Sequence, residues 1–248
     1  MKIIVDLFNQ HSGDIKELKR MALSAHLAGA DAVKLQLLNS QRIWGNDSRK
    51  KLELTYDQTM RIFDYCRGLD IEILATVFDE EKLEWIDRMG VETYKIASCT
   101  SKNDPDLCKK IISRGKHTLI STGLHEVDEY PFGFEEHIEY LFCIAEYPTF
   151  LCHPKLKKMP SFFCREEKVE FCDDSTERKS YTGYSDHTIG IASALKAYMK
   201  GASVLEKHFT LDPYVQNVTE KAHLCSFTPE TLRQFKNLIR ELDIINEK

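Results

Sequence analysis

The chain has 248 residues, of which 42% are hydrophobic and 29% charged, and its 39 acidic and 34 basic residues give a formal net charge of -5. This composition is that of an ordinary globular domain and excludes disordered and fibrous classes. Because there is no basic surplus, the chain has no electrostatic basis for binding nucleic acid or an anionic membrane surface.

Cysteine usage and the N-terminus indicate the compartment. The eight cysteines form no CxxC pair, which favours reduced thiols in a cytoplasm. The apolar stretch Met1 to Val5 is too short for a secretion signal, and no run approaches the ~18 apolar residues of a membrane helix. We therefore expect a cytoplasmic protein that does not enter a membrane.

Short apolar strand patterns alternate with helical patterns along the whole chain, which is typical of a parallel sheet. The predicted strands are Ile3 to Phe8, Ala32 to Leu37, Glu72 to Val77, Thr93 to Ala97, His117 to Ser121, Tyr140 to Ala145, Tyr181 to Tyr184 and Ser203 to Lys207. Helices are predicted over 15–28, 57–67, 80–89, 190–200 and 229–245, with almost none between strands five and six.

The number of these units predicts the fold class. Eight units in 248 residues give 31 residues each, the length of one strand, one helix and two loops. We therefore predict a single-domain α/β protein over residues 1–248, a (β/α)8 TIM barrel. An open doubly wound sheet is the alternative, but the glycine-rich turn that marks it is missing, since Asp6 to Gly13 holds one glycine.

Polar residues end every predicted strand, and in a barrel these ends meet at one mouth. In chain order they are Asp6, Lys34, Gln36, Thr76, Lys95, Ser98, Ser121, Glu146, Tyr147, Ser185, Asp186, His187, Glu206, Lys207 and His208. Lysines and hydroxyls around one pocket predict an anionic ligand, a carboxylate or a phosphate. For any one of them alone, a surface cap is the alternative.

Two histidines end neighbouring predicted strands. His187 and His208 can share a divalent cation such as Mn²⁺ or Zn²⁺ and leave positions open for substrate oxygens. Asp186 and Glu206 are then expected to accept hydrogen bonds from the imidazoles. Histidines that are merely hydrogen-bonded in the core are the alternative. A zinc site is also conceivable from Cys152, His153, Cys164 and Cys172, although their spacing fits no standard pattern.

Several segments together resemble the sialic acid synthase family, in that family's order. They are AGADAVKLQ (28–36), YKIAS (94–98), LISTGL (119–124), EYPT (146–149), GYSDHTIGI (183–191) and GASVLEKHFTLD (201–212). The resemblance implies a (β/α)8 barrel that condenses phosphoenolpyruvate with an aldose such as N-acetylmannosamine, giving a nine-carbon 2-keto-3-deoxy acid and phosphate.

The resemblance also implies a role for individual residues. His187 and His208 match the protein ligands of the family's Mn²⁺, which serves as a Lewis acid, and Gln36 and Tyr147 match positions that face the sugar. Asp6 stands where the family has a glutamate acid/base, shorter by one methylene. The positions that match phosphoenolpyruvate-binding residues are Lys34, Thr76, Lys95, Ser98, Ser121 and Ser185.

The chain departs from the family mainly on the acceptor side. Cys99 and Thr100 replace a Gly-Glu or Gly-Asp pair, and 215–223 replaces a PGPDH-like stretch. Whether Glu220 takes the place of the missing aspartate is left open. The chain stops at Lys248, so we expect no C-terminal antifreeze-like domain. Whether the protein is a homodimer or uses a separate antifreeze-like subunit is left open, as is the identity of the aldose.

Two other functions compete with this interpretation. Lys95 could form an imine with a keto acid, as in a Schiff-base aldolase. Alternatively, the barrel could bind phosphoenolpyruvate and metal without turnover, alone or with a partner.

Overall fold

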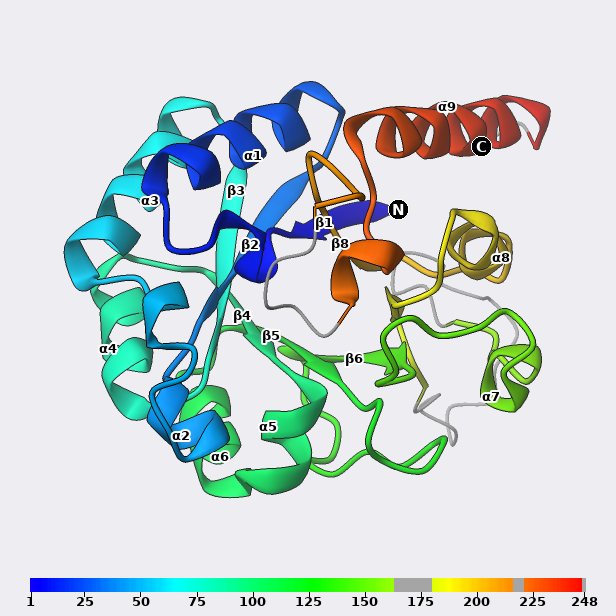
Figure 1. The fold of residues 1–248 in the computed structure, drawn as a ribbon. Helices are drawn as coiled ribbons and strands as arrows, with labels where there is room; N and C mark the ends of the chain where they lie inside the picture. The colour runs from blue at the N-terminus through cyan, green and yellow to red at the C-terminus, as the bar shows by residue number, and fades with distance from the viewer. Residues whose placement is uncertain (163–179, 216–220, 247–248) are drawn as a thin grey trace.

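A computed structural model of the chain describes residues 1–162, 180–215 and 221–246. Eight parallel strands form a closed barrel in which each strand pairs with the next and β8 pairs with β1 (Figure 1). The strands are β1 Lys2–Asp6, β2 Ala32–Leu37, β3 Glu72–Val77, β4 Thr93–Ile96, β5 His117–Ser121, β6 Ile138–Cys143, β7 Gly183–Asp186 and β8 Val204–His208. The predicted (β/α)8 fold is confirmed.

Helices surround the barrel and connect its strands (Figure 1). They are α1 Ile15–Leu27, α2 Ser40–Trp44, α3 Tyr56–Gly68, α4 Glu80–Arg88, α5 Ser98–Asn103, α6 Pro105–Ile112, α7 Pro154–Lys157, α8 Ala192–Met199 and α9 Pro229–Ile245, with 3₁₀ turns at Phe8–His11, Lys50–Leu52 and Ala222–Cys225. Within the described ranges, none of these helices has both the length and the apolar character of a membrane span.

The longer helices follow directly from local sequence signals. In α1, Leu18, Met21 and Ala25 recur at helical spacing and are buried against the barrel. In α9, Pro229 occupies the first helical position and the Thr228 side chain caps the backbone N–H of Thr231. These helices therefore have both a buried apolar face and a satisfied N-terminus.

The barrel interior has two layers of opposite character. The layer nearer the amino ends of the strands is an apolar cluster, formed by Ile4, Ala32, Leu74, Leu119, Leu141 and Val204. Because side chains alternate along a strand, the residue two positions further on each of these strands also points inward. On β1, β2 and β8 those residues are Asp6, Lys34 and Glu206, and all three are buried. The polar side chains expected at the strand ends therefore form the next layer, toward the carboxyl ends of the strands, and rest on the apolar cluster.

Some predicted boundaries were wrong. β6 begins and ends two residues earlier than predicted, and β7 is Gly183–Asp186 rather than Tyr181 to Tyr184. The prediction placed Ser185 and Asp186 after the end of this strand, yet in the structure they belong to it and pair with Glu206 and Lys207 of β8. The segment from Asp6 continues as a 3₁₀ turn rather than as strand.

The helices between β4 and β6 show one miss and one success. Helices α5 and α6 were not predicted. In α5, Cys99, Thr100 and Ser101 are weak helix formers, whereas α6 carries a start signal that was missed, Asp104 as N-cap followed by Pro105. The segment 122–137 between β5 and β6 contains no helix, as expected.

Candidate active site

The polar strand ends line a cavity with two connected parts at the barrel mouth. The inner chamber, about 50 Å³, lies among Asp6, Lys34, Lys95, Ser121, Ser185, His187 and Glu206. The outer chamber, about 300 Å³, lies among Phe8, Asn9, Leu38, Ile43, Trp44, Phe78, Leu124 and their neighbours. Gln36, Ser98, Tyr147, His208 and Lys34 line both. The inner volume is that of one or two waters, so a small organic anion must extend into the outer chamber.

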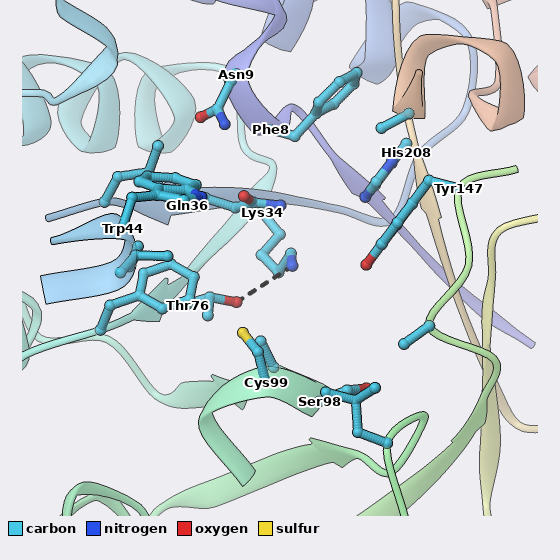
Figure 2. Close-up of a pocket in the computed structure, with 17 residues that line it drawn as sticks. Phe8, Asn9, Lys34, Gln36, Trp44, Thr76, Ser98, Cys99, Tyr147 and His208 are labelled. Atoms are coloured by element: carbon cyan, nitrogen blue, oxygen red, sulfur yellow. Dashed lines mark hydrogen bonds between the residues drawn. The ribbon is translucent and has the colours of Figure 1, made fainter. Parts of the chain in front are cut away.

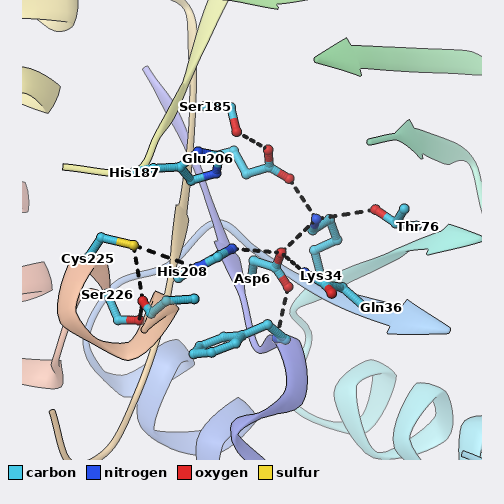
Figure 3. A network of polar contacts seen from close by, with 12 residues as sticks. Asp6, Lys34, Gln36, Thr76, Ser185, His187, Glu206, His208, Cys225 and Ser226 are labelled. Carbon is cyan, nitrogen blue, oxygen red and sulfur yellow. Dashed lines mark hydrogen bonds and ion pairs between the residues drawn. The ribbon is translucent and has the colours of Figure 1, made fainter. Parts of the chain in front are cut away.

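Lys34 is the hub of a buried ion-pair network (Figure 3). Its Nζ lies 2.8 Å from Asp6 Oδ2 and 2.9 Å from Glu206 Oε1. It also donates to Thr76 Oγ1 at 3.2 Å. Burial alone would lower the pKa of Lys34, but Asp6 and Glu206 overcome this and raise it above its ordinary value. Lys34 is therefore a permanent cation.

Glu206 joins the two lysines of the inner chamber. Its Oε2 accepts from Ser185 Oγ at 2.6 Å and lies 3.5 Å from Lys95 Nζ. Burial alone would raise the pKa of Glu206, yet Lys34 and Lys95 hold it well below its ordinary value. The two lysines and the carboxylates of Asp6 and Glu206 thus balance in charge.

Lys95 differs from Lys34 in its surroundings. Its Nζ donates to Ser121 Oγ at 2.8 Å and to the Ile96 carbonyl at 2.9 Å. Burial lowers the pKa of Lys95, and the attraction of Glu206 does not compensate. Of the two ammonium groups, Lys95 is the one that most lacks a counter-charge.

Ser98 is held at the border of the two chambers by the loop after β5. The backbone N–H of Gly123 donates to Ser98 Oγ at 2.9 Å. A Cβ at position 123 would come within 2.8 Å of Cys143 Sγ and 2.9 Å of the Ala145 nitrogen. Only glycine permits this approach, which fixes the Ser98 hydroxyl toward the cavity.

The imidazoles of His187 and His208 lie close together, with ring centroids 5.3 Å apart. His187 Nδ1 donates to the Ile144 carbonyl at 2.7 Å, which leaves Nε2 as the ring nitrogen that can bind a metal. Burial lowers the pKa of His208, and its Nε2 lies 3.6 Å from Asp6 Oδ2. His208 is therefore in the neutral form that can coordinate a metal.

Aromatic rings hold His208 on both faces. Phe8 stacks on it with centroids 4.6 Å apart and an interplanar angle of 16°, and Tyr147 stacks at 5.6 Å and 1°. The Tyr147 ring also lies 4.3 Å from that of His187. Phe8 has a φ of +26°, a strained value for a bulky residue, and its N–H donates to Asp6 Oδ1 at 2.8 Å. The ring orientations are thus set by packing.

These features fit a metal ion bound by two histidines. Two imidazoles on one ion at ~2.1 Å place their centroids roughly 5 Å apart, close to the separation seen here. Among the described residues no group of three or more His, Cys, Asp and Glu side chains is arranged to hold a metal. The metal and its two histidine ligands stay predictions.

The outer chamber is mainly apolar at its far end (Figure 2). Trp44 lies on one side of the pocket in this view, and His208 and Tyr147 lie on the other. Trp44 comes from α2, which begins where the Asn39 side chain caps the N–H of Arg42. The loop after β2 thus adds an aromatic wall to the barrel mouth.

The structure brings together the side chains to which the family resemblance gave a role, whereas Glu146 and Asp186, also expected at the mouth, line neither chamber. Asp6, Lys34, Thr76, Lys95, Ser98, Ser121, Ser185, Gln36, Tyr147, His187 and His208 all line one or both chambers. Their roles as ligands of phosphoenolpyruvate, sugar or metal stay predictions.

The expected acceptors for the histidines were wrong. Glu206 binds the two lysines, and Asp186 lies on the other face of its strand, where its Oδ2 accepts from Lys207 Nζ at 2.7 Å. The Ile144 carbonyl takes that role for His187 instead. Cys164, Cys172 and Glu220 lie outside the described residues.

Sequence reasoning missed the apolar part of the site. Phe8, Leu38, Ile43, Trp44 and Phe78 line the outer chamber without having been singled out. A signal was available, because 18 residues, from 38 to 55, separate β2 from α3. Long loops at the carboxyl ends of barrel strands commonly carry binding residues.

Comparison of the sequence with known proteins identifies the family. The model of the NeuB family matches residues 21–247. The chain belongs to the NeuB family. Its NeuB relatives include an N,N'-diacetyllegionaminic acid synthase of Campylobacter jejuni, 30% identical over 97% of this chain and 75% of the relative. An N-acetylneuraminate-9-phosphate synthase of Drosophila melanogaster is 26% identical over 96% of this chain and 66% of the relative.

The fold is also that of a solved structure. An N-acetylneuraminic acid synthetase from Leptospira borgpetersenii, crystallised with citrate, superposes with a TM-score of 0.78 at 24% identity, over 99% of this chain and 85% of that one. The family model thus confirms the sequence-based family assignment, and the superposition agrees with the barrel fold.

Proposed function

We propose that the chain condenses phosphoenolpyruvate with an aldose in a reaction that requires a divalent cation. The product is a 2-keto-3-deoxy sugar acid of the sialic acid type, together with inorganic phosphate. A bond forms between C3 of phosphoenolpyruvate and the aldehyde carbon, water adds at C2, and the C2–O bond to phosphate breaks. N-acetylmannosamine or a related acylamino sugar is the acceptor.

The observation that carries this proposal is the arrangement of Lys34 and Lys95 beside the histidine pair. Two buried ammonium groups within reach of hydroxyls suit a ligand with both a carboxylate and a phosphate. An anion reaching the lysines replaces the contacts they make with Asp6 and Glu206. Relatives named as synthases of diacetyllegionaminic acid and N-acetylneuraminate 9-phosphate support the same reaction class.

The charge balance of the inner chamber supports the need for a cation. Lys34 and Lys95 are matched by Asp6 and Glu206, so the chamber has no net charge to offset a multiply charged anion. Mn²⁺ held by His187 and His208 would provide it. When bound, the ion supplies Lewis-acid polarisation of the acceptor aldehyde.

The remaining residues bind, orient or move a proton. Asp6 Oδ2 accepts from Gln36 Nε2 at 2.8 Å and, once Lys34 turns to the substrate, accepts the proton of the attacking water. Gln36 and Tyr147 orient the sugar, since both line the two chambers. Thr76, Ser98, Ser121 and Ser185 supply fixed hydroxyls to the phosphoenolpyruvate.

The direct test is phosphate release from phosphoenolpyruvate with Mn²⁺ and a panel of acylamino sugars led by N-acetylmannosamine. His208→Ala should abolish release, whereas His26→Ala, in α1 on the outside of the barrel, should leave it unchanged. Phosphoenolpyruvate binding without release from any sugar would contradict a synthase and favour a binding role.

A Schiff-base aldolase is the second candidate, because burial lowers the pKa of Lys95 and so favours the nucleophilic amine. Borohydride with pyruvate would then trap an adduct at Lys95, detected by peptide mass. Cation-dependent phosphate release without trapping would exclude it.

A further inference from the structure

At the far end of the outer chamber, the described lining residues include no group suited to a charged ligand. Five apolar side chains form it, and we call them the apolar wall: Leu38, Ile43, Trp44, Phe78 and Leu124. They follow β2, β3 and β5, so three separate segments contribute the same character. A wall of this kind favours contact with hydrocarbon and penalises an unpaired phosphate.

Cations near this wall are already engaged. Among the described residues that line the outer chamber, Lys34 is the only lysine or arginine, and its Nζ contacts Asp6, Glu206 and Thr76. The Arg49 guanidinium stacks on the Trp44 ring, with its Cζ 4.3 Å from the centroid, but Arg49 is not part of the lining.

One polar atom of the lining is unsatisfied. Asn9 is 6% exposed, lines the outer chamber, and its Oδ1 is buried without a hydrogen-bond partner among the described residues. An orphaned buried acceptor in a binding cavity indicates a donor that arrives with the ligand. An amide N–H or a hydroxyl of a sugar provides such a donor.

The site fixes which end of the acceptor meets the wall. The aldehyde carbon must lie close to the histidine pair and the lysines, where the new bond forms. Trp44 lies across the pocket from His208 and Tyr147 (Figure 2). The end of the sugar opposite the aldehyde, C6 in a hexose, therefore points toward the apolar wall.

We propose that the acceptor is an unphosphorylated acylamino hexose. Its C6 is either a methyl group, as in a 6-deoxy sugar, or a hydroxymethyl group, and the methyl group is preferred. Its C6 packs on the apolar wall, and one of its N–H or O–H groups donates to Asn9 Oδ1. This inference rests on the proposed condensation and specifies its acceptor. A hexose 6-phosphate would place a dianion against Trp44 and Phe78 without a free cation among the described lining residues.

The test compares three acceptors that differ only at C6. They are 2-acetamido-2,6-dideoxy-D-mannose, N-acetylmannosamine and N-acetylmannosamine 6-phosphate, each assayed for phosphate release from phosphoenolpyruvate with Mn²⁺. We expect kcat/KM of the 6-deoxy sugar to equal or exceed that of the hydroxyl sugar by up to about tenfold. The 6-phosphate should be worse than either by at least about 100-fold.

A binding readout separates recognition from turnover. The chain has two tryptophans, Trp44 and Trp85, and Trp85 lies on α4 against Tyr56, away from the cavity. In Trp85→Phe, only Trp44 reports, so its fluorescence should change on titration with the 6-deoxy sugar in the presence of phosphoenolpyruvate and stay constant with the 6-phosphate.

Variants assign the effect to the residues named. Asn9→Leu should raise KM for the acceptor by about tenfold or more, while Asn9→Asp, which keeps an acceptor oxygen, should retain more of the affinity. Trp44→Ala should narrow the preference for the 6-deoxy sugar over the 6-phosphate. Met60→Ala, a partly exposed apolar residue on α3 outside the lining, is the matched control and should change neither.

The outcomes separate the two proposals. Equal turnover of all three sugars, or the 6-phosphate as best substrate with loss in Arg49→Ala, would overturn the specificity while leaving the condensation intact. No phosphate release with any sugar, but a Trp44 response to the 6-deoxy sugar alone, would overturn the condensation and keep the recognition.

Discussion

The inner and outer chambers adjoin each other but satisfy their side chains in opposite ways. In the inner chamber every charge faces an opposite charge, as Lys34 does with Asp6 and Glu206. In the outer chamber the wall is apolar, and within the described part of the chain Asn9 Oδ1 has no hydrogen-bond partner. In the inner chamber, a substrate anion can bind the lysines by replacing the ion pairs that they make with Asp6 and Glu206. In the outer chamber, the apolar side chains can select the acceptor by its shape.

The largest effect should follow from removing a lysine of the inner chamber. Lys95→Met leaves Glu206 with one fewer cation and the substrate anion with one fewer donor, so kcat/KM for phosphoenolpyruvate should fall by about 10³-fold or more. Steady-state phosphate release measures this. Lys236→Met, which removes a surface pair with Asp31, is the matched control and should act within twofold of the unmodified chain. A similar loss of kcat/KM in both variants would contradict a specific role for the Lys95 charge in binding phosphoenolpyruvate.

Metal removal should have the next largest effect. Dialysis against a chelator should reduce phosphate release by at least about 100-fold, and Mn²⁺ should restore it. His187→Ala should raise the Mn²⁺ concentration needed for half-maximal rate, because one of two proposed protein ligands is lost. Full activity in the presence of chelator would break the link between the histidine pair and the chemistry.

The smallest effect, and the one that best separates the chambers, should come from Phe78→Ala. Loss of part of the apolar wall should raise KM for the acceptor by about tenfold while KM for phosphoenolpyruvate changes less than about twofold. Ser121→Ala is the converse variant, since its hydroxyl accepts from Lys95 Nζ in the inner chamber. If both variants shift both KM values equally, the two chambers do not act separately.

Much of the fold was predictable because most strands carry simple patterns. β2, β3 and β5 have the predicted bounds, each being a short run rich in apolar and β-branched residues. β7 was displaced because Ser185 and Asp186 are polar and yet buried inside the sheet. Their stability depends on Glu206 and Lys207 from another strand, which no local pattern reveals.

The site was predictable in its polar members for the same reason. A lysine or serine at a strand end is visible in the sequence, and the barrel brings such residues together. The partners of each group were not predictable, as Glu206 shows by binding lysines rather than a histidine. The apolar wall was hidden because Trp44 and Phe78 look like ordinary core residues until the loop geometry is known.

Asp6 has a further consequence, for how the protein matures. Its carboxylate contacts Lys34 on β2 and faces His208 on β8, so its partners come from opposite ends of the chain. Pairings between residues so distant in sequence form late in folding, because a long loop must close first. During synthesis, Lys95 emerges well before Glu206, the carboxylate that contacts it in the folded barrel. We therefore expect the anion site to be the last part of the barrel to assemble, which makes substrate binding a reporter of complete folding.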